Sequence, residues 1–268
     1  MIPYSINQLT TLNWSFQKDV EHFARHGVPA ITPQRRKLEP YGVDRAVKLM
    51  RDAGLKIAAY QTQSPFTLGQ PGLWPGEIER FRGQLEVAAR LGVDVMIFQV
   101  GPRDSLDYDE TERRFLTVLE KLVPMAERAG VRIAVEHAHA LRMDLGYLSS
   151  FHDSVDLADK VDSPYFTVCL ETNHAWIERH LYRDIKERTR RIGIVQISDF
   201  KAGTTITPAR VPLGDGDIPI KRITDAILDA GYAGSFDLEL IGPEIEKMGY
   251  EEAIRRCQVY LKGLGPKQ

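Results

Sequence analysis

The chain has 268 residues, enough for one large domain or two small ones, and its 43% hydrophobic and 27% charged residues are ordinary for a soluble globular protein. The formal net charge of −2 argues against nucleic acid as a partner, and no run approaches the roughly 20 apolar residues that span a bilayer. The two cysteines make no disulfide framework and the first residues show no secretory signal, so we expect a cytoplasmic protein without membrane contact.

Apolar, β-like runs recur along the whole chain. They cover residues 4–9, 28–32, 55–60, 93–100, 131–136, 166–171, 192–198 and 236–240. Several of them begin just after a glycine, as in HGV at 26–28 and AGV at 129–131. Glycine commonly ends a helix because it adopts left-handed dihedral angles at little cost. The sequence therefore predicts eight strands, several of which follow a helix that ends in glycine.

Amphipathic stretches lie between these strands. In 79–91 and 111–129, apolar residues recur at spacings of three and four, which is typical of helices. Strands that alternate with helices pair in parallel, and eight such units over about 250 residues predict an α/β fold, a (β/α)₈ TIM barrel, with residues 1–268 as a single domain. A doubly wound open sheet is disfavoured, because no glycine-rich phosphate-binding turn follows the first strand.

Two predicted connections, 61–76 and 201–219, are longer and richer in proline and glycine than the others. Each follows the carboxyl end of a strand, which is the face where such barrels place their active sites. We expect binding loops at these two positions, and ordinary surface loops are the alternative.

Four polar residues stand at the ends of four successive predicted strands: Glu136, Glu171, Gln196 and Glu239. An acidic side chain in a strand is costly to bury unless its charge is compensated. Because side chains alternate along a strand, all four point into the mouth of the predicted barrel. A divalent metal is the simplest shared partner; a hydrogen bond from each acid to a neighbouring Lys or Arg is the alternative.

The residue types in this set indicate which metal to expect. Three carboxylates and one amide supply hard oxygen donors, and the set has no imidazole or thiolate. Such donors favour Mg²⁺ or Mn²⁺ over Zn²⁺ or copper. Co²⁺ is also acceptable, since a six-coordinate oxygen site can hold it.

Five segments carry a resemblance to a known family: VEHAHA at 135–140, ETNHAW at 171–176, VQISDF at 195–200, GDGDIP at 214–219, and AGYAGSFDLEL at 230–240. The chain resembles the xylose isomerase-like barrels, known as sugar phosphate isomerases and epimerases. These include tagatose 3-epimerase and hydroxypyruvate isomerase. The resemblance runs over most of the chain and is densest between residues 131 and 250.

This resemblance implies roles for individual residues. Glu136 and Glu239 match the two carboxylates that the family uses both as metal ligands and as proton-transfer groups. Glu171 stands where the family usually has an Asp ligand, and His174 matches a substrate-binding histidine. Gln196 replaces a frequent histidine, as it does in the hydroxypyruvate isomerase branch. The longer Glu171 and the missing histidine leave the metal and the substrate undetermined.

Three further residues are candidates for contact with the substrate. His139 follows Glu136 by three positions and is expected to bind a substrate hydroxyl or to be an ordinary loop imidazole. Trp176 is expected either to form an apolar wall under a sugar ring or to pack as a core aromatic. Arg210 lies in the long loop 201–219, where relatives place an arginine over the substrate oxygens; a solvated loop arginine is the alternative.

The expected function is a metal-dependent isomerase, either an aldose–ketose isomerase or a keto-sugar epimerase, acting on a keto-sugar or small hydroxy-carbonyl compound. One carboxylate removes the proton next to the carbonyl, and the metal stabilises the resulting enediolate. Another acid returns the proton to the opposite face or to the adjacent carbon. Glu136 and Glu239 are the expected acid–base pair.

Other functions of such a barrel are alternatives to this one. If the enediolate expels a leaving group, the same site becomes a lyase for a 3-keto-glycoside or a dehydratase for a keto-inositol, and this alternative stays open. An apurinic endonuclease would need more histidine ligands and a basic groove, and a pure binding barrel would not need both carboxylates. The expected partner is a small carbohydrate. Related barrels often form dimers or tetramers, which leaves a homo-oligomer open.

Overall fold

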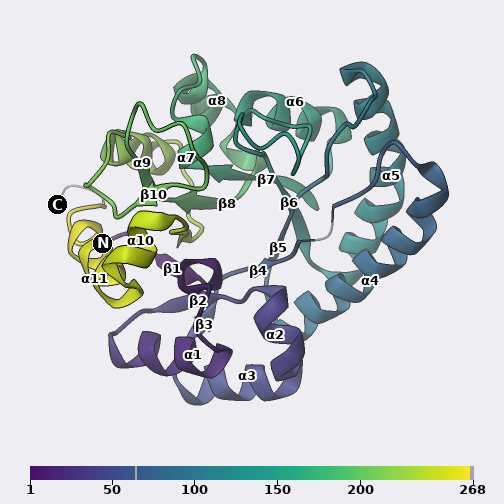
Figure 1. Ribbon diagram of the computed structural model, residues 1–268. Coiled ribbons are helices and arrows are strands. Elements are labelled where there is room, and N and C mark those ends of the chain that lie inside the picture. Colours follow the sequence, from purple (N-terminus) through teal and green to yellow (C-terminus); the bar gives the residue numbers. More distant parts are fainter. Residues whose placement is uncertain (64, 266–268) are drawn as a thin grey trace.

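Strands lie at the centre of the protein with helices around them (Figure 1), in a computed structural model that describes residues 1–63 and 65–265. The main strands are β1 (Tyr4–Asn7), β2 (Ala30–Thr32), β3 (Lys56–Ile57), β4 (Tyr60–Gln61), β5 (Val95–Phe98), β6 (Arg132–Glu136), β7 (Phe166–Glu171), β8 (Ile192–Ile197) and β11 (Phe236–Leu238). They form one sheet in the order β3-β2-β1-β11-β8-β7-β6-β5-β4, and neighbouring strands pair in parallel.

The two ends of this sheet meet in a single segment of chain. β3 pairs with β2 and β4 pairs with β5, yet both come from the third predicted strand, 55–60, which extends one residue further, to Gln61. Its backbone passes from one neighbour to the other, since Ala58 N donates to Ile31 O and Thr62 N donates to Ile97 O. The sheet thus has eight strand positions around a ring, and the predicted (β/α)₈ TIM barrel is confirmed.

The helices of the described residues are α1 (Phe16–Arg25), α2 (Arg35–Tyr41), α3 (Val43–Asp52), α4 (Trp74–Leu91), α5 (Tyr108–Ala129), α6 (Phe151–Val161), α7 (Thr172–Ala175), α8 (Leu181–Arg188), α9 (Ile220–Asp229), α10 (Pro243–Met248) and α11 (Tyr250–Leu261). α4 and α5 end at the predicted glycine junctions, because Gly92 and Gly130 have left-handed dihedral angles with φ of 69° and 65°. The Asp107 side chain begins α5 by accepting a hydrogen bond from Glu110 N at 2.8 Å.

The hydrophobic core has two parts, one inside the barrel and one between the barrel and its helices. The inner part consists of Ala59, Val95, Ile97, Ala134, Cys169 and Ile194. The outer and much larger part includes Val135, Leu170 and Leu238. These three residues alternate with the inward-facing ones along their strands, so the predicted direction of the side chains is confirmed.

The last barrel strand ends one residue before Glu239, although the sequence predicted a strand over 236–240. Glu239 N still donates to Ile197 O at 3.2 Å, which holds the residue beside β8.

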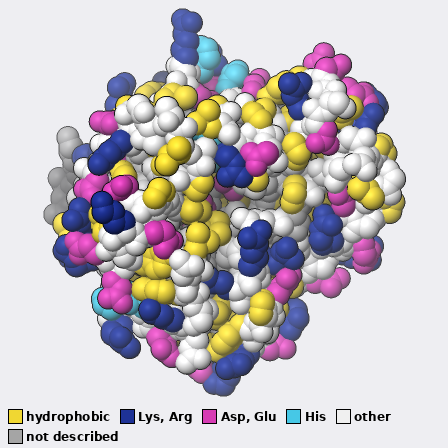
Figure 2. All heavy atoms as spheres, viewed as in Figure 1, with side chains coloured by type: hydrophobic (Ala, Val, Ile, Leu, Met, Phe, Trp, Pro, Cys, Tyr) yellow, Lys and Arg dark blue, Asp and Glu magenta, His cyan; other side chains and the backbone are white. Residues whose placement is uncertain are grey.

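On the face seen in Figure 2, positive and negative side chains are interspersed. In the described residues, every helix is too short or too polar to cross a bilayer.

Candidate active site

The four polar residues predicted from the strand ends lie at one end of the barrel. Glu136 and Glu171 are the last residues of β6 and β7, Gln196 lies on β8, and Glu239 follows β11. These strands are neighbours in the order β11-β8-β7-β6, and Glu171 is paired in register with Gln196. All four side chains are buried. The sheet therefore brings together residues that are up to about a hundred positions apart.

Two side-chain amides connect Glu136 to Glu239. Gln61 Nε2 donates to Glu136 Oε2 at 3.1 Å, and Gln196 Nε2 donates to Gln61 Oε1 at 3.1 Å. Gln196 Nε2 also lies 2.6 Å from Glu239 Oε2. Gln61 was not predicted as a site residue, although it has the same signal as the others, a polar residue at the end of an apolar run.

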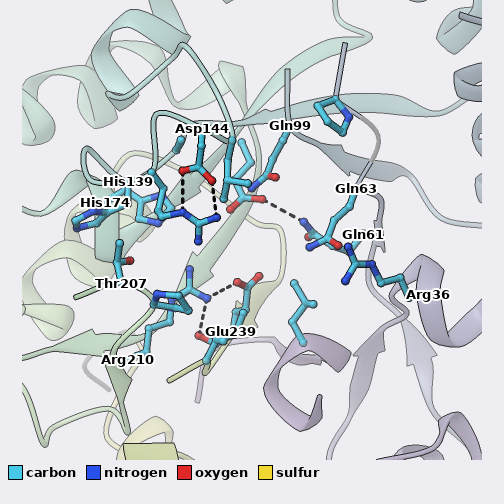
Figure 3. Close-up of a pocket in the computed structure, with 18 residues that line it drawn as sticks. Arg36, Gln61, Gln63, Gln99, His139, Asp144, His174, Thr207, Arg210 and Glu239 are labelled. Carbon is cyan, nitrogen blue, oxygen red and sulfur yellow. Dashed lines mark hydrogen bonds and ion pairs between the residues drawn. The ribbon is translucent and has the colours of Figure 1, made fainter. Parts of the chain in front are cut away.

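Arg210 lies beside Glu239 at the cavity (Figure 3), and it also pairs with Glu171, so it joins two of the predicted metal ligands. Its guanidinium donates to Glu171 Oε2 at 3.1 Å and to Glu239 Oε1, and the residue is only 5% exposed. The sequence predicted that Arg210 contacts the substrate. The structure shows it bonded to carboxylates, as the alternative interpretation of the acidic residues predicts, and its contact with the substrate stays a prediction.

Burial and mutual repulsion shape the charge of this site. Burial, followed by the charges of Glu239 and Glu171, raises the pKa of Glu136 to about 8. Burial also raises the pKa values of Glu171 and Glu239, although the charge of Arg210 opposes the rise. Burial alone would lower the pKa of Arg210, but the two carboxylates bonded to it raise that pKa above its usual range. Three buried carboxyl groups thus lie around a single guanidinium, and burial favours their protonated, neutral forms.

Two histidines present different groups to the same cavity. His174 Nδ1 lies 2.8 Å from the carbonyl oxygen of His137, which can only accept, so His174 Nδ1 carries a hydrogen and its Nε2 is an acceptor. His139 Nδ1 accepts from Leu141 N at 3.1 Å, so its Nε2 is a donor. Burial lowers the pKa of both rings, which keeps them neutral. Their centroids are 5.5 Å apart.

A cavity of about 390 Å³ opens at this end of the barrel. Its lining residues include Gln61, Glu136, His139, His174, Arg210 and Glu239. Both loops predicted to bind substrate contribute to it, 61–76 through Gln63 and Pro65, and 201–219 through Thr207 and Pro208. Trp176 does not line this cavity, and it packs against the hydrophobic core, as the core-aromatic alternative predicts.

Loop 201–219 is organised around Asp199, whose role was not predicted. Its Oδ1 accepts from Phe200 N and Ile218 N at 2.8 and 3.0 Å, and its Oδ2 accepts from Gly214 N and Gly216 N at 2.9 and 3.1 Å. A Cβ at Gly216 would lie 2.3 Å from Asp199 Oδ1, so the close approach requires glycine. The GDGDIP segment therefore wraps a carboxylate and fixes the loop that carries Arg210.

The donor types in this site fit a divalent cation, because three buried carboxyl groups supply oxygen ligands of the kind that such cations prefer. Within residues 1–63 and 65–265, however, no three His, Cys, Asp or Glu side chains are placed to hold a metal ion. Arg210 bridges Glu171 and Glu239 instead. The predicted ligand set of Glu136, Glu171, Gln196 and Glu239 stays a prediction.

Residues 20–260 match the family model of the xylose isomerase-like TIM barrel. The chain belongs to this family. The resemblance that the five sequence segments indicated is thereby confirmed. Membership accounts for the barrel and for the position of the cavity, since barrels of this kind use the carboxyl ends of their strands.

Known proteins are similar to this chain over half of its length or more. An inosose isomerase from Bacillus licheniformis is 26% identical over 263 residues, 94% of each chain. The L-ribulose-5-phosphate 3-epimerase UlaE of Escherichia coli (strain K12) is 27% identical over 150 residues, 55% of this chain and 50% of UlaE. A crystal structure of the IolI protein with a bound zinc atom has a TM-score of 0.86 and 23% identity, covers 97% of each chain, and supports the fold alone.

Proposed function

We propose that this protein is a sugar isomerase or epimerase that moves a proton at the carbon next to a carbonyl group. The observation that carries the proposal is that Glu136 and Glu239 line one cavity from opposite ends of a four-strand arc, with β7 and β8 between their strands. A substrate lying across this arc has a carboxylate on each side. The names of the inosose isomerase and the ribulose-phosphate epimerase support a keto-sugar or a related hydroxy-carbonyl substrate.

The proposed reaction uses the two carboxyl groups in turn. One carboxylate accepts the proton from the carbon next to the carbonyl, and the electron pair moves to the carbonyl oxygen to form an enediolate. The other carboxylic acid returns a proton to the opposite face in an epimerisation. In an isomerisation the proton goes to the former carbonyl carbon, and the hydroxyl proton passes from one enediolate oxygen to the other, so that the carbonyl group changes place. The raised pKa of Glu136 suits this role, because a group that both gives and takes a proton works best near the operating pH.

The two histidines hold the substrate in the proposed complex. The Nε2–H of His139 donates to one substrate oxygen, and Nε2 of His174 accepts from a hydroxyl group, as their hydrogen bonds to the backbone dictate. A sugar offers neighbouring hydroxyl groups that can donate and accept, so this pair selects for it. Both imidazoles stay neutral and do not compete with Glu136 for the proton.

We propose a divalent metal as the cofactor, held by Glu136, Glu171, Gln196 and Glu239. When bound, it stabilises the negative charge of the enediolate. The oxygen donors favour Mn²⁺ or Mg²⁺, with Co²⁺ also acceptable, over the zinc named for the IolI structure. Tight native zinc in elemental analysis of the purified protein would contradict this ligand set.

Product analysis tests the proposal. The purified protein is incubated with inosose and, separately, with L-ribulose 5-phosphate, and products are followed by mass spectrometry and NMR. The proposal predicts a product of unchanged mass with altered configuration or carbonyl position. Loss of water from inosose would instead support the dehydratase that shares the same proton abstraction.

A further inference from the structure

We propose that Arg210 and a divalent cation are alternative partners of the Glu171–Glu239 pair, and that the cation, when it binds, releases the Arg210 guanidinium into the cavity. The inference rests on the proposed function, because it assumes that these carboxylates hold a metal. It adds a positioning step that depends on Arg210, which is itself not a metal ligand.

The hydrogen bonds of the two carboxylates carry the first part of the inference. Glu171 Oε1 accepts from Asn173 N at 2.9 Å and from Ser198 Oγ at 3.3 Å, and Glu171 Oε2 accepts from Arg210. Glu239 Oε1 accepts from Arg210, and its Oε2 from Gln196. Each of the four oxygens therefore already has a donor. Among these donors Arg210 alone carries a positive charge and contacts both carboxylates, so it is the group that competes directly with a bound cation for the pair.

The backbone of Arg210 is anchored, so the movement has to occur in its side chain. Arg210 pairs with Phe200 in a two-stranded sheet, β9 (Asp199–Phe200) with β10 (Arg210–Val211), and its N donates to Ile241 O at 3.0 Å. The four backbone hydrogen bonds to Asp199 hold the same loop. The four side-chain torsions of arginine allow the guanidinium to turn without a change in this framework.

The cavity gives the released guanidinium a place to go. Arg210 already lines it, together with His139, His174 and Thr207 (Figure 3). A guanidinium there keeps its charge in the site and faces the oxygens of a substrate held by the two histidines. Arg210 thus neutralises the carboxylates before the metal binds and contacts the substrate afterwards, which reconciles its observed bonds with its predicted role.

Metal titration of the full chain tests this exchange without any substrate. Protein freed of metal by chelation and dialysis is titrated with MnCl₂ at fixed pH, and free Mn²⁺ is measured by electron paramagnetic resonance. The variants are Arg210→Met and, as a matched control, Arg142→Met. Arg142 lines the same cavity but pairs with Asp144, at 2.8 and 2.9 Å, outside the predicted ligand set. The control measures the general effect of removing one positive charge.

We expect Arg210→Met to lower the Kd for Mn²⁺ roughly tenfold or more, because the metal no longer has to break a charge-assisted pair, and Arg142→Met to change it less than about threefold. An unchanged or higher Kd for Mn²⁺ in Arg210→Met would overturn the exchange. An equal decrease of the Kd in both variants would also overturn it, as would the absence of Mn²⁺ binding to both the wild type and Arg210→Met. Proton transfer by Glu136 and Glu239 is tested separately, by incorporation of deuterium from solvent into the product. The exchange of Arg210 for a metal and the proposed isomerase function can therefore fail independently.

A second measurement uses the wild-type protein in case Arg210→Met does not fold. Arginine Nε–Hε resonances are recorded by ¹⁵N NMR, and the signal of Arg210 is assigned with Arg210→Lys, which keeps the positive charge. Saturating Mg²⁺ should shift this signal strongly and leave the Arg142 signal nearly unchanged. An unshifted Arg210 signal at saturation would overturn the exchange.

Discussion

Gln61 and Glu136 are joined by a hydrogen bond of 3.1 Å between Nε2 and Oε2, although they lie 75 positions apart in the chain. Gln61 is the last residue of β4 and Glu136 the last of β6, so the bond crosses the barrel mouth past β5. Gln61 Oε1 also accepts from Gln196 Nε2. One amide thus orients a proposed base and a proposed metal ligand together.

Replacement of Gln61 by Met should lower kcat/KM roughly tenfold, because Glu136 loses its side-chain donor in a buried site. The same hydrogen bond lowers the pKa of Glu136, so its loss should raise that pKa further and move the pH profile of kcat/KM upward. Gln63→Met is the matched control, since Gln63 lines the same cavity without contacting Glu136. Equal losses in both variants would contradict a specific role for Gln61.

Glu136→Gln and Glu239→Gln should each lower kcat roughly 100- to 10,000-fold, the range typical for loss of a general acid or base. Thermal melts should show folded proteins, because both residues lie at the rim beyond the packed layers of the barrel. Asp144→Asn, at the same cavity, should retain most of the activity. A near wild-type rate in either glutamine variant would remove that residue from the mechanism.

Asp199→Asn should loosen loop 201–219, because an amide offers one acceptor oxygen where the carboxylate accepts four backbone N–H groups with two. Cleavage by trypsin after Lys201 and Arg210 should become roughly tenfold faster, while the circular dichroism of the barrel stays unchanged. Asp217→Asn is the control in the same loop, since Asp217 accepts only from Ala202 N in the described structure. An equal rise in both variants would show that Asp199 does not organise the loop.

The stability of the protein should depend on Asp19, which lies in α1 and accepts from Gln8, Thr11 and Lys37. Burial raises the pKa of Asp19 from 3.8 to about 6, against the opposing charge of Lys37. The folded state therefore retains this proton longer than the unfolded chain does. The stability that this proton contributes is fully present below the pKa that Asp19 has in the unfolded chain. It is lost as the pH rises through the pKa that Asp19 has in the folded protein.

Urea unfolding of wild type and Asp19→Asn at a series of pH values measures this effect. The free energy of unfolding of the wild type relative to the variant should fall by about 3 kcal/mol in total between pH ~3 and pH ~7, with the steepest decline between the two pKa values, and then level off. The comparison uses the pH slope and not the absolute stability, since asparagine also changes the hydrogen bonds. If the difference in the free energy of unfolding instead rose with pH, the charge of Lys37 would outweigh burial in its effect on the pKa of Asp19.

The fold could be predicted because its signals are local and repeated. Glycines at helix ends, and the alternation of inward- and outward-facing residues along strands, each recur in several strand–helix units. An error in one unit therefore does not change the predicted fold. The outward direction of the Val135, Leu170 and Leu238 side chains, toward the helices, was predictable for the same reason. The division of the third strand into β3 and β4 was not, because it depends on how the chain pairs with two different neighbours.

The candidate site was predictable where its residues follow a strand by three positions, as His139 and His174 do, or stand at strand ends. Glu136, Glu171, Gln196 and Glu239 follow from that position, and Gln61 could have been found by the same rule. The contact of Arg210 with two carboxylates could not, since the path of loop 201–219 depends on backbone groups that converge on Asp199. Single-sequence patterns carry no signal for such a convergence.

Solvent labelling tests the central claim, proton transfer by Glu136 and Glu239, most directly. Wild type and the two glutamine variants are incubated in deuterated water with inosose or L-ribulose 5-phosphate, and deuterium at the carbon next to the carbonyl is followed by NMR. We expect label in the product of the wild type, because the abstracted proton rests on a carboxyl group that exchanges with solvent, and we expect loss of labelled product in both variants. Active wild-type protein that forms unlabelled product would show a direct hydride shift and would contradict the account.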